Sequence, residues 1–173
     1  MKNFFLVILL FFLSSINIVT ANSNIVFIDI DKVITTSKAG SSVLKQLNEL
    51  NNKNIKKLKN EEKILKDKET KLITQKNILS ESEFQSSIDK LRLEINNHNK
   101  NKNKILSDFA KLKLANTNRL LELITPILTA YSKEKSIAMI LQKKDLVIGK
   151  TELDISNEII KIVNSDINEF KIK

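Results

Sequence analysis

Residues 78–95 read ILSESEFQSSIDKLRLEI, and this stretch decides the fold. It contains the tetrapeptide Ser80-Glu81-Ser82-Glu83, which has the S-x-x-E pattern of a capping box at the start of a helix. An apolar series begins directly after it, with spacings of four and three residues that place the series on one helix face. Because a long helical stretch also precedes the box, the chain is expected to turn back with a tip near residues 80–83. The result is an antiparallel helical hairpin.

The outgoing helix of this hairpin is predicted over residues 41–79. Those 39 residues contain neither Pro nor Gly, and they would span about 58 Å as a helix. One heptad position is apolar along this stretch except at Asn51, whereas the partner position is mostly polar (Ile55, Glu62, Glu69, Lys76). A half-polar seam indicates a helix that packs against its neighbour along only part of its inner face.

The return helix carries the most regular apolar pattern in the chain and is predicted to continue to about Leu120. Its middle, residues 96–104, is very polar, as are residues 51–63, which should lie opposite. These polar stretches predict flexibility in the part of the hairpin that is remote from the tip. The predicted seam consists of Leu58, Leu65, Leu72, Leu79, Phe84, Ile88, Leu91, Ile95, Ile105 and Phe109.

Short apolar segments flank the hairpin. Residues 25–30 (IVFIDI) are predicted to form a buried strand, with Asp31 as the N-cap of a helix that begins near Val33. Pro126 is expected to stop or kink the return helix, with Thr125 as a possible new cap. Residues 137–141 (IAMIL) and 146–148 (LVI) surround a polar turn and predict a β-hairpin.

Gly149 ends this predicted β-hairpin, and Asp154 or Ser156 is expected to cap a last amphipathic helix. Three short strands and one helix barely make a body, because an open sheet of that size exposes its edges. Several chains that join their strands would close those edges, so the sequence predicts an oligomer with a small β body and projecting helical hairpins. The residues expected to assemble the body are Ile25, Phe27, Ile140 and Val147.

The N-terminus has the pattern of an export signal. Lys2 precedes ten uninterrupted apolar residues (4–13, FFLVILLFFL), and a small residue, Ala21, follows a more polar stretch. Ten residues cover about half of a ~30 Å hydrocarbon core, so cleavage after Ala21 is favoured over an uncleaved anchor. The mature chain, residues 22–173, would carry a net charge of about +8, since only Lys2 is lost from the total of +9.

Catalytic chemistry is not predicted, and no cofactor or metal is expected. The chain has no Cys, one His and two Gly. Asp29-Ile30-Asp31 resembles the DxD of haloacid-dehalogenase phosphatases, but Lys32-Val33 stands where that motif has Gly-Thr, so a strand end followed by a helix cap is the preferred interpretation. Glu94 and His98 have a spacing that metal sites use, yet His98 occupies a seam position and is interpreted as a polar seam residue.

The charge of the hairpin allows two interpretations. Residues 51–110 contain 14 Lys and Arg against 9 Asp and Glu, a net charge of about +5. This surface either attracts anionic partners, namely acidic clients, lipid head groups or lipopolysaccharide, or is simply a solvated face in a Lys- and Asn-rich chain. Nucleic acid is not expected for an exported chain, and aromatic residues for base stacking are not interleaved with the basic residues. The candidate basic surface comprises Lys53, Lys56, Lys57, Lys59, Lys100 and Lys104.

Residues 22–173 resemble the Skp/OmpH family of periplasmic chaperones. The opening IVFIDIDKVITTSKAG (25–40) is similar to the family's first strand and helix start. MIL (139–141), LVI (146–148) and LDISNEII (153–160) are similar to its hairpin and its D-[IL]-[ST] entry into the last helix. Pro126 and the Asn-rich middle of the return helix depart from the family pattern.

The resemblance implies a mainly α fold, with long antiparallel hairpin arms projecting from a trimeric β-barrel-like body around a cavity. It also implies an ATP-independent holdase for unfolded outer-membrane β-barrel proteins in the periplasm. The chain then divides into a signal peptide (1–21), body (22–40), arm (41–122) and body (123–173). The alternative is a membrane-anchored coiled-coil stalk resembling a peripheral stalk subunit of an ATP synthase, which needs an uncleaved N-terminus and gives the predicted strands no role.

Overall fold

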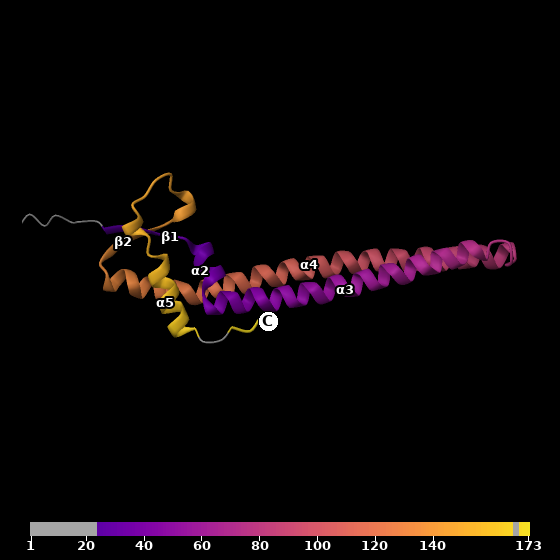
Figure 1. The fold of residues 1–173 in the computed structure, drawn as a ribbon, viewed down its shortest axis with the longest axis horizontal. Helices are drawn as coiled ribbons and strands as arrows, with labels where there is room; N and C mark the ends of the chain where they lie inside the picture. The colour runs from indigo at the N-terminus through magenta and orange to yellow at the C-terminus, as the bar shows by residue number, and fades with distance from the viewer. Residues whose placement is uncertain (1–23, 168–169) are drawn as a thin grey trace, which may run out of the picture.

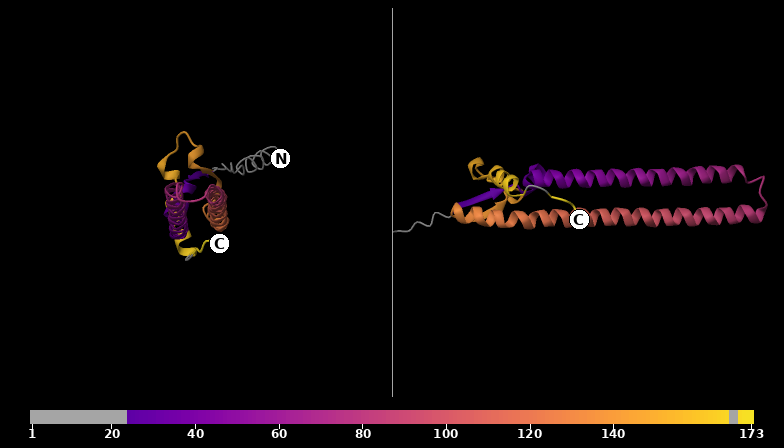
Figure 2. Two further views of the ribbon diagram at one scale, coloured as in Figure 1. Left: turned by 90° about the vertical axis from the view of Figure 1, so that its right-hand side faces the viewer. Right: turned by 90° about the horizontal axis from the view of Figure 1, so that it is seen from below.

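A computed structural model describes residues 24–167 and 170–173, so the predicted signal peptide lies outside the described residues. Two long helices run side by side away from a small body at one end (Figure 1). In Figure 2, the part of this helix pair that extends past the body has no other drawn helix or strand next to it. The elements in order are β1 (Asn24–Ile28), α2 (Ile30–Thr36), α3 (Lys38–Thr74), α4 (Glu81–Glu134), β2 (Ile137–Gln142), the 3-10 turns η1 (Lys143–Asp145) and η2 (Thr151–Leu153), and α5 (Ser156–Asp166).

We call the parts of α3 and α4 that extend beyond the body the arm. The turn at its tip has the hydrogen bonds that the capping box predicts. The Ser80 side chain accepts a hydrogen bond from the backbone N–H of Glu83, and the Glu83 carboxylate accepts one from the backbone N–H of Ser80. Hydrogen bonds from the Ser80 side chain and backbone hold the pKa of Glu83 below its usual value. The outgoing helix ends at Thr74 rather than Leu79, and a turn over residues 75–78 and a bend at Leu79 follow it.

Pro126 does not end the return helix, so the predicted stop is wrong. Helix α4 continues through Pro126 to Glu134. Thr125 does not cap a new helix, because its hydroxyl donates to the Leu121 carbonyl one turn back in the same helix. Ile124 is fully buried just before the proline, and Ile127 packs against the same core just after it. Burial on both sides offsets the lost backbone hydrogen bond.

The sheet of the single chain has two parallel strands, β1 and β2, with Val26 opposite Ile140. The predicted β-hairpin at 137–148 is wrong for this chain, because Leu146 to Ile148 stay outside the sheet. After η1 the chain instead returns across Phe27, which forms an isolated bridge with Asp154. Gly149 permits this path, since a Cβ there would lie 2.8 Å from Cε1 of Phe27.

The hydrophobic core lies where the arm meets the body. Val33 of α2, Leu120 and Ile124 of α4, and Ile159 and Val163 of α5 are completely buried. This one cluster ties α2 and α5 to the root of the arm, while most of the hairpin has no core of its own. The predicted mainly α fold with a small β part and a long helical hairpin is confirmed.

Candidate functional site on the arm and body

The predicted seam of the arm is only half closed. Leu58 is buried, whereas Leu72, Phe84, Ile88 and most other seam residues are half-buried. Ile95 is 36 % exposed, and a shallow opening between the two helices is lined by Leu72, Phe84, Ile88 and Ile95 together. The seam therefore keeps apolar surface within reach of solvent along its length. The half-buried members are Leu65, Leu72, Leu79, Phe84, Ile88, Leu91, Ile105 and Phe109.

A polar layer interrupts the seam at His98. The imidazole is 8 % exposed, and its Nδ1 lies 3.0 Å from Oε2 of Glu61 on the opposite helix. Its Nε2 is buried without a hydrogen-bond partner, since the nearest carboxylate oxygen, on Glu62, is 3.7 Å away. Lys102 donates to Glu62 at 3.1 Å, and this bond and charge, with a smaller effect of His98, lower the pKa of Glu62.

These pairs place His98 in the seam between α3 and α4, as the heptad pattern predicts. Glu61 and Glu62 lie at opposite ring nitrogens, so they do not converge on one point. Glu94, the suspected second ligand, pairs with Lys68 across the hairpin. Among residues 24–167 and 170–173, no group of three or more His, Asp or Glu side chains is placed to hold a metal ion. The partners of His98 could have been found by aligning the two helices from the capping box.

The basic surface lies on the exposed faces of both arm helices. Lys57 lies 4.0 Å from Glu61, and Lys104 pairs with Asp108. Within the described part of the chain, Lys53, Lys56 and Lys59 make no ion pair and remain open to partners. Large aliphatic side chains are exposed between the charges, and the heptad analysis missed all of them except Ile55 because they lie off the seam. They are Ile55, Ile64, Ile73, Ile78, Leu93, Leu106 and Leu114.

The four residues predicted for body assembly are not all brought together. Phe27 is buried under the returning chain, and Ile140 is half-buried on the neighbouring strand. Ile25 is 43 % exposed on β1, and Val147 is completely exposed in the loop after η1. The body thus presents apolar β-branched side chains beside a short sheet.

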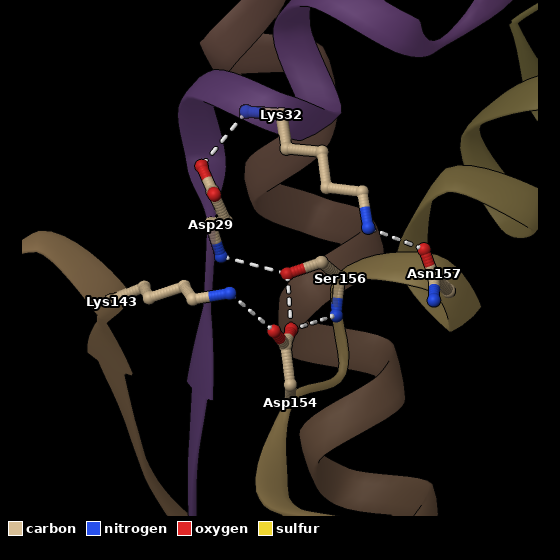
Figure 3. Close-up of polar contacts among 6 residues, drawn as sticks. All are labelled: Asp29, Lys32, Lys143, Asp154, Ser156 and Asn157. Carbon is tan, nitrogen blue, oxygen red and sulfur yellow. Dashed lines mark hydrogen bonds and ion pairs between the residues drawn. The ribbon is translucent and has the colours of Figure 1, made fainter. Parts of the chain in front are cut away.

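A polar clamp, made by the six residues drawn in Figure 3, holds the body together. The Ser156 hydroxyl accepts from the backbone N–H of Asp29 at 2.8 Å and donates to Asp154. Asp154 also accepts from the Ser156 backbone N–H and from Lys143, both at 3.0 Å. The clamp thereby joins the end of β1, the η1 turn and the start of α5, and a further bond links Lys32 to Asn157.

The clamp corrects both predicted helix caps. Asp29, not Asp31, caps α2 by accepting from the Lys32 backbone N–H at 2.9 Å. Asp154 supplies the carboxylate at the start of α5, although the formal cap position is Ile155. Burial raises the pKa of Asp154, but the hydrogen bonds from Ser156 and the pairing with Lys143 outweigh it and leave the pKa below its usual value. The D-[IL]-[ST] pattern is therefore a structural joint.

Within the described residues, no helix combines the length and the apolar composition that a membrane crossing requires.

The chain is similar in sequence to one protein family and in fold to a solved structure. The family described as outer membrane protein (OmpH-like) matches residues 24–163. A crystal structure from Caulobacter crescentus CB15, of a protein assigned as an OmpH-like outer membrane chaperone, superposes with a TM-score of 0.72 at 15 % identity. The superposition covers 88 % of this chain and 90 % of that one, and it shows a shared fold. No curated protein sequence matches the chain significantly.

Proposed function

The chain belongs to the OmpH-like family, and from this membership we propose that it is an ATP-independent periplasmic holdase. It binds unfolded outer-membrane β-barrel proteins between its arms and prevents their aggregation. It is not an enzyme in this proposal, and binding is passive and reversible. The observation that carries the proposal is the long arm, which no other described element covers beyond the body and which combines a half-closed apolar seam with exposed lysines.

The surface of the arm suits this class of client. An unfolded barrel protein exposes strands of alternating apolar and polar residues, whose free edges pair readily with one another. Isolated aliphatic side chains such as Ile73 and Leu93 offer weak contacts at many places, and none of them fixes the shape of the client. Many weak contacts made together hold a chain far more strongly than any one of them.

The body supports assembly into a homotrimer. A two-stranded sheet is barely stable alone, and its open edges favour pairing with strands of other copies. Ile25, Met139 and Val147 remain exposed close to this sheet and would be covered by such pairing. Three joined bodies would close into a barrel-like core, and the three arms would then surround one cavity.

The compartment follows from the predicted signal peptide. Removal of residues 1–21 would release the mature chain into the periplasm, where no ATP is supplied. The alternative, an anchored coiled-coil stalk, requires that these residues stay attached. The mass of the protein purified from cells separates the two, because retention of residues 1–21 contradicts release into the periplasm.

The basic arm surface would attract clients of net negative charge. The attraction should weaken as salt rises, because the Debye length falls from about 10 Å at 0.1 M to 3 Å at 1 M. Lipopolysaccharide or anionic lipid head groups are further partners of the same chemistry. Replacement of Lys53, Lys56, Lys57 and Lys59 by Gln should weaken client binding and flatten its salt dependence. The matched control makes the same change at four exposed body lysines, Lys133, Lys144, Lys150 and Lys161.

The direct test is suppression of aggregation. A urea-unfolded β-barrel protein is diluted into buffer without nucleotide, and turbidity is followed with and without the mature chain. One assumed trimer per client should abolish most of the turbidity. Undiminished turbidity at that ratio, with the chain shown to be folded by circular dichroism, would rule out the holdase.

A further inference from the structure

Residues 170–173, here called the tail, lie across the root of the arm. The tail contacts both arm helices, since Phe170 bonds to α3 and Lys173 bonds to α4, and it ends beside α4 in the right-hand view of Figure 2. Phe170 is 2 % exposed, and the guanidinium of Arg119 lies 4.5 Å from the centre of its ring. Ile172 packs against the core, while Lys171 and Lys173 are exposed. The tail therefore alternates apolar residues facing inward with charged residues facing solvent.

The arm holds the tail through its backbone. Gln46 of α3 donates to the Phe170 carbonyl at 2.7 Å and accepts from the Ile172 N–H at 3.3 Å. Asn116 of α4 donates to the Lys173 carbonyl at 3.2 Å and accepts from the N–H of the same residue at 3.1 Å. The contacts are completed by two bonds to tail carbonyls, from Arg119 to Lys171 and from Ser42 to Phe170.

None of these six hydrogen bonds involves a tail side chain, so they would fit any extended peptide. The side-chain amides of Gln46 and Asn116 each bond to both a backbone N–H and a backbone carbonyl of the tail. Such bonds give affinity that does not depend on the peptide sequence, as when a peptide adds a strand to a sheet edge. The Phe170 pocket adds a preference for an aromatic residue. Asn116 is 1 % exposed, and its amide N–H also donates to the Leu112 carbonyl at 2.8 Å. The Oδ1 atom of Asn116 is therefore the group that needs a partner N–H from the tail when water is excluded.

We propose that the surface formed by Ser42, Gln46, Asn116 and Arg119, here called the root groove, is a binding site for extended client segments. Its ligand is a peptide with an aromatic residue followed by alternating polar and apolar residues, and the tail occupies it as an internal substitute. This inference rests on the proposed function for the identity of the client. The alternation is that of a strand from an unfolded β-barrel protein.

The tail makes the root groove selective. A tethered segment has an effective concentration of the order of millimolar, so a free peptide competes poorly with it. A client that also contacts the arms gains avidity and displaces the tail. The family match ends at residue 163, so the tail lies outside the matched segment.

The first test measures binding of a fluorescent peptide of residues 167–173 (INEFKIK) by anisotropy. The full chain with Phe170→Ala should bind it at least tenfold more tightly than the unaltered chain or the control Lys171→Ala, because its own tail is loosened. Ile172→Ala, which leaves the aromatic anchor, should act in the same direction. Adding Gln46→Ala to Phe170→Ala should weaken peptide binding at least tenfold. Equal affinity in the unaltered and Phe170→Ala chains would overturn the inference, provided that circular dichroism shows both folded.

The second test asks whether a client uses the same groove. An unfolded β-barrel protein should displace the labelled peptide from the Phe170→Ala chain. If it suppresses aggregation but displaces no peptide, the root groove is a self-contact only and the inference fails, while the proposed function stands. If peptide binds as expected but aggregation is not suppressed, the holdase proposal fails and the client assignment of the groove fails with it.

Discussion

Replacing His98 with Leu should stabilise the arm. The substitution removes Nε2, which is buried without a partner at a cost of about 1–3 kcal/mol. It loses the hydrogen bond to Glu61, worth about 1 kcal/mol, and Glu61 is exposed enough to bond to water instead. A leucine in a site that is 8 % exposed gains about 1 kcal/mol from added apolar burial. The net expectation is a rise of about 2 kcal/mol in the free energy of unfolding.

Urea unfolding followed by circular dichroism, at one fixed protein concentration, measures this difference. The concentration is fixed because the stability of an oligomer depends on it. A gain of 2 kcal/mol corresponds to about 4–8 °C in melting temperature for a chain of this size. The control Asn99→Leu adds the same side chain at an exposed neighbouring position and should change stability by less than about 0.5 kcal/mol. The reasoning is refuted if His98→Leu is less stable than the parent, or if Asn99→Leu gains as much.

Three further substitutions test the body. Gly40→Ala should destabilise the chain by about 3 kcal/mol in urea unfolding, because the new Cβ would lie 1.6 Å from the Ile34 carbonyl oxygen; unchanged stability would contradict that contact. Leu120→Ala should cost about 2–5 kcal/mol, whereas Leu114→Ala, at a 62 % exposed site on the same helix, should cost less than about 1 kcal/mol. The pKa of Asp154 is lowered in the folded state. Its contribution to the free energy of unfolding is therefore fully present above the pKa of the unfolded state, about 3.9, and is lost as pH falls through the lower pKa of the folded state. Unfolding measured between pH 5 and 2 should therefore show a smaller acid loss in Asp154→Asn, and an equal loss would contradict the clamp.

The arm was predictable because local signals and periodicity agree there. The capping box at Ser80 fixes where the return helix begins, and the apolar spacing after it fixes which face turns inward. The end of the outgoing helix was predicted five residues too late, since nothing in residues 75–79 is a strong helix breaker. Pairs such as His98 with Glu61 depend on the register between the two helices, which the apolar pattern of one helix does not contain and which only an alignment from the capping box supplies.

The body was predicted less well because its structure depends on tertiary contacts. Leu146 to Ile148 have the composition of a strand, yet they lie outside the sheet. The chain instead passes close to Phe27 at Gly149, and Lys143 pairs with Asp154. Pro126 remains helical because residues around it are buried in the core. The tail has no sequence signal for docking, because its partners on the arm bind its backbone.

Light scattering of a mixture of the mature chain and an unfolded β-barrel protein, separated by gel filtration, tests the central claim most directly. A holdase built from joined bodies and surrounding arms predicts one species whose mass equals three copies of the chain plus one client. A single protomer that elutes apart from the client would contradict both the assembly and its role.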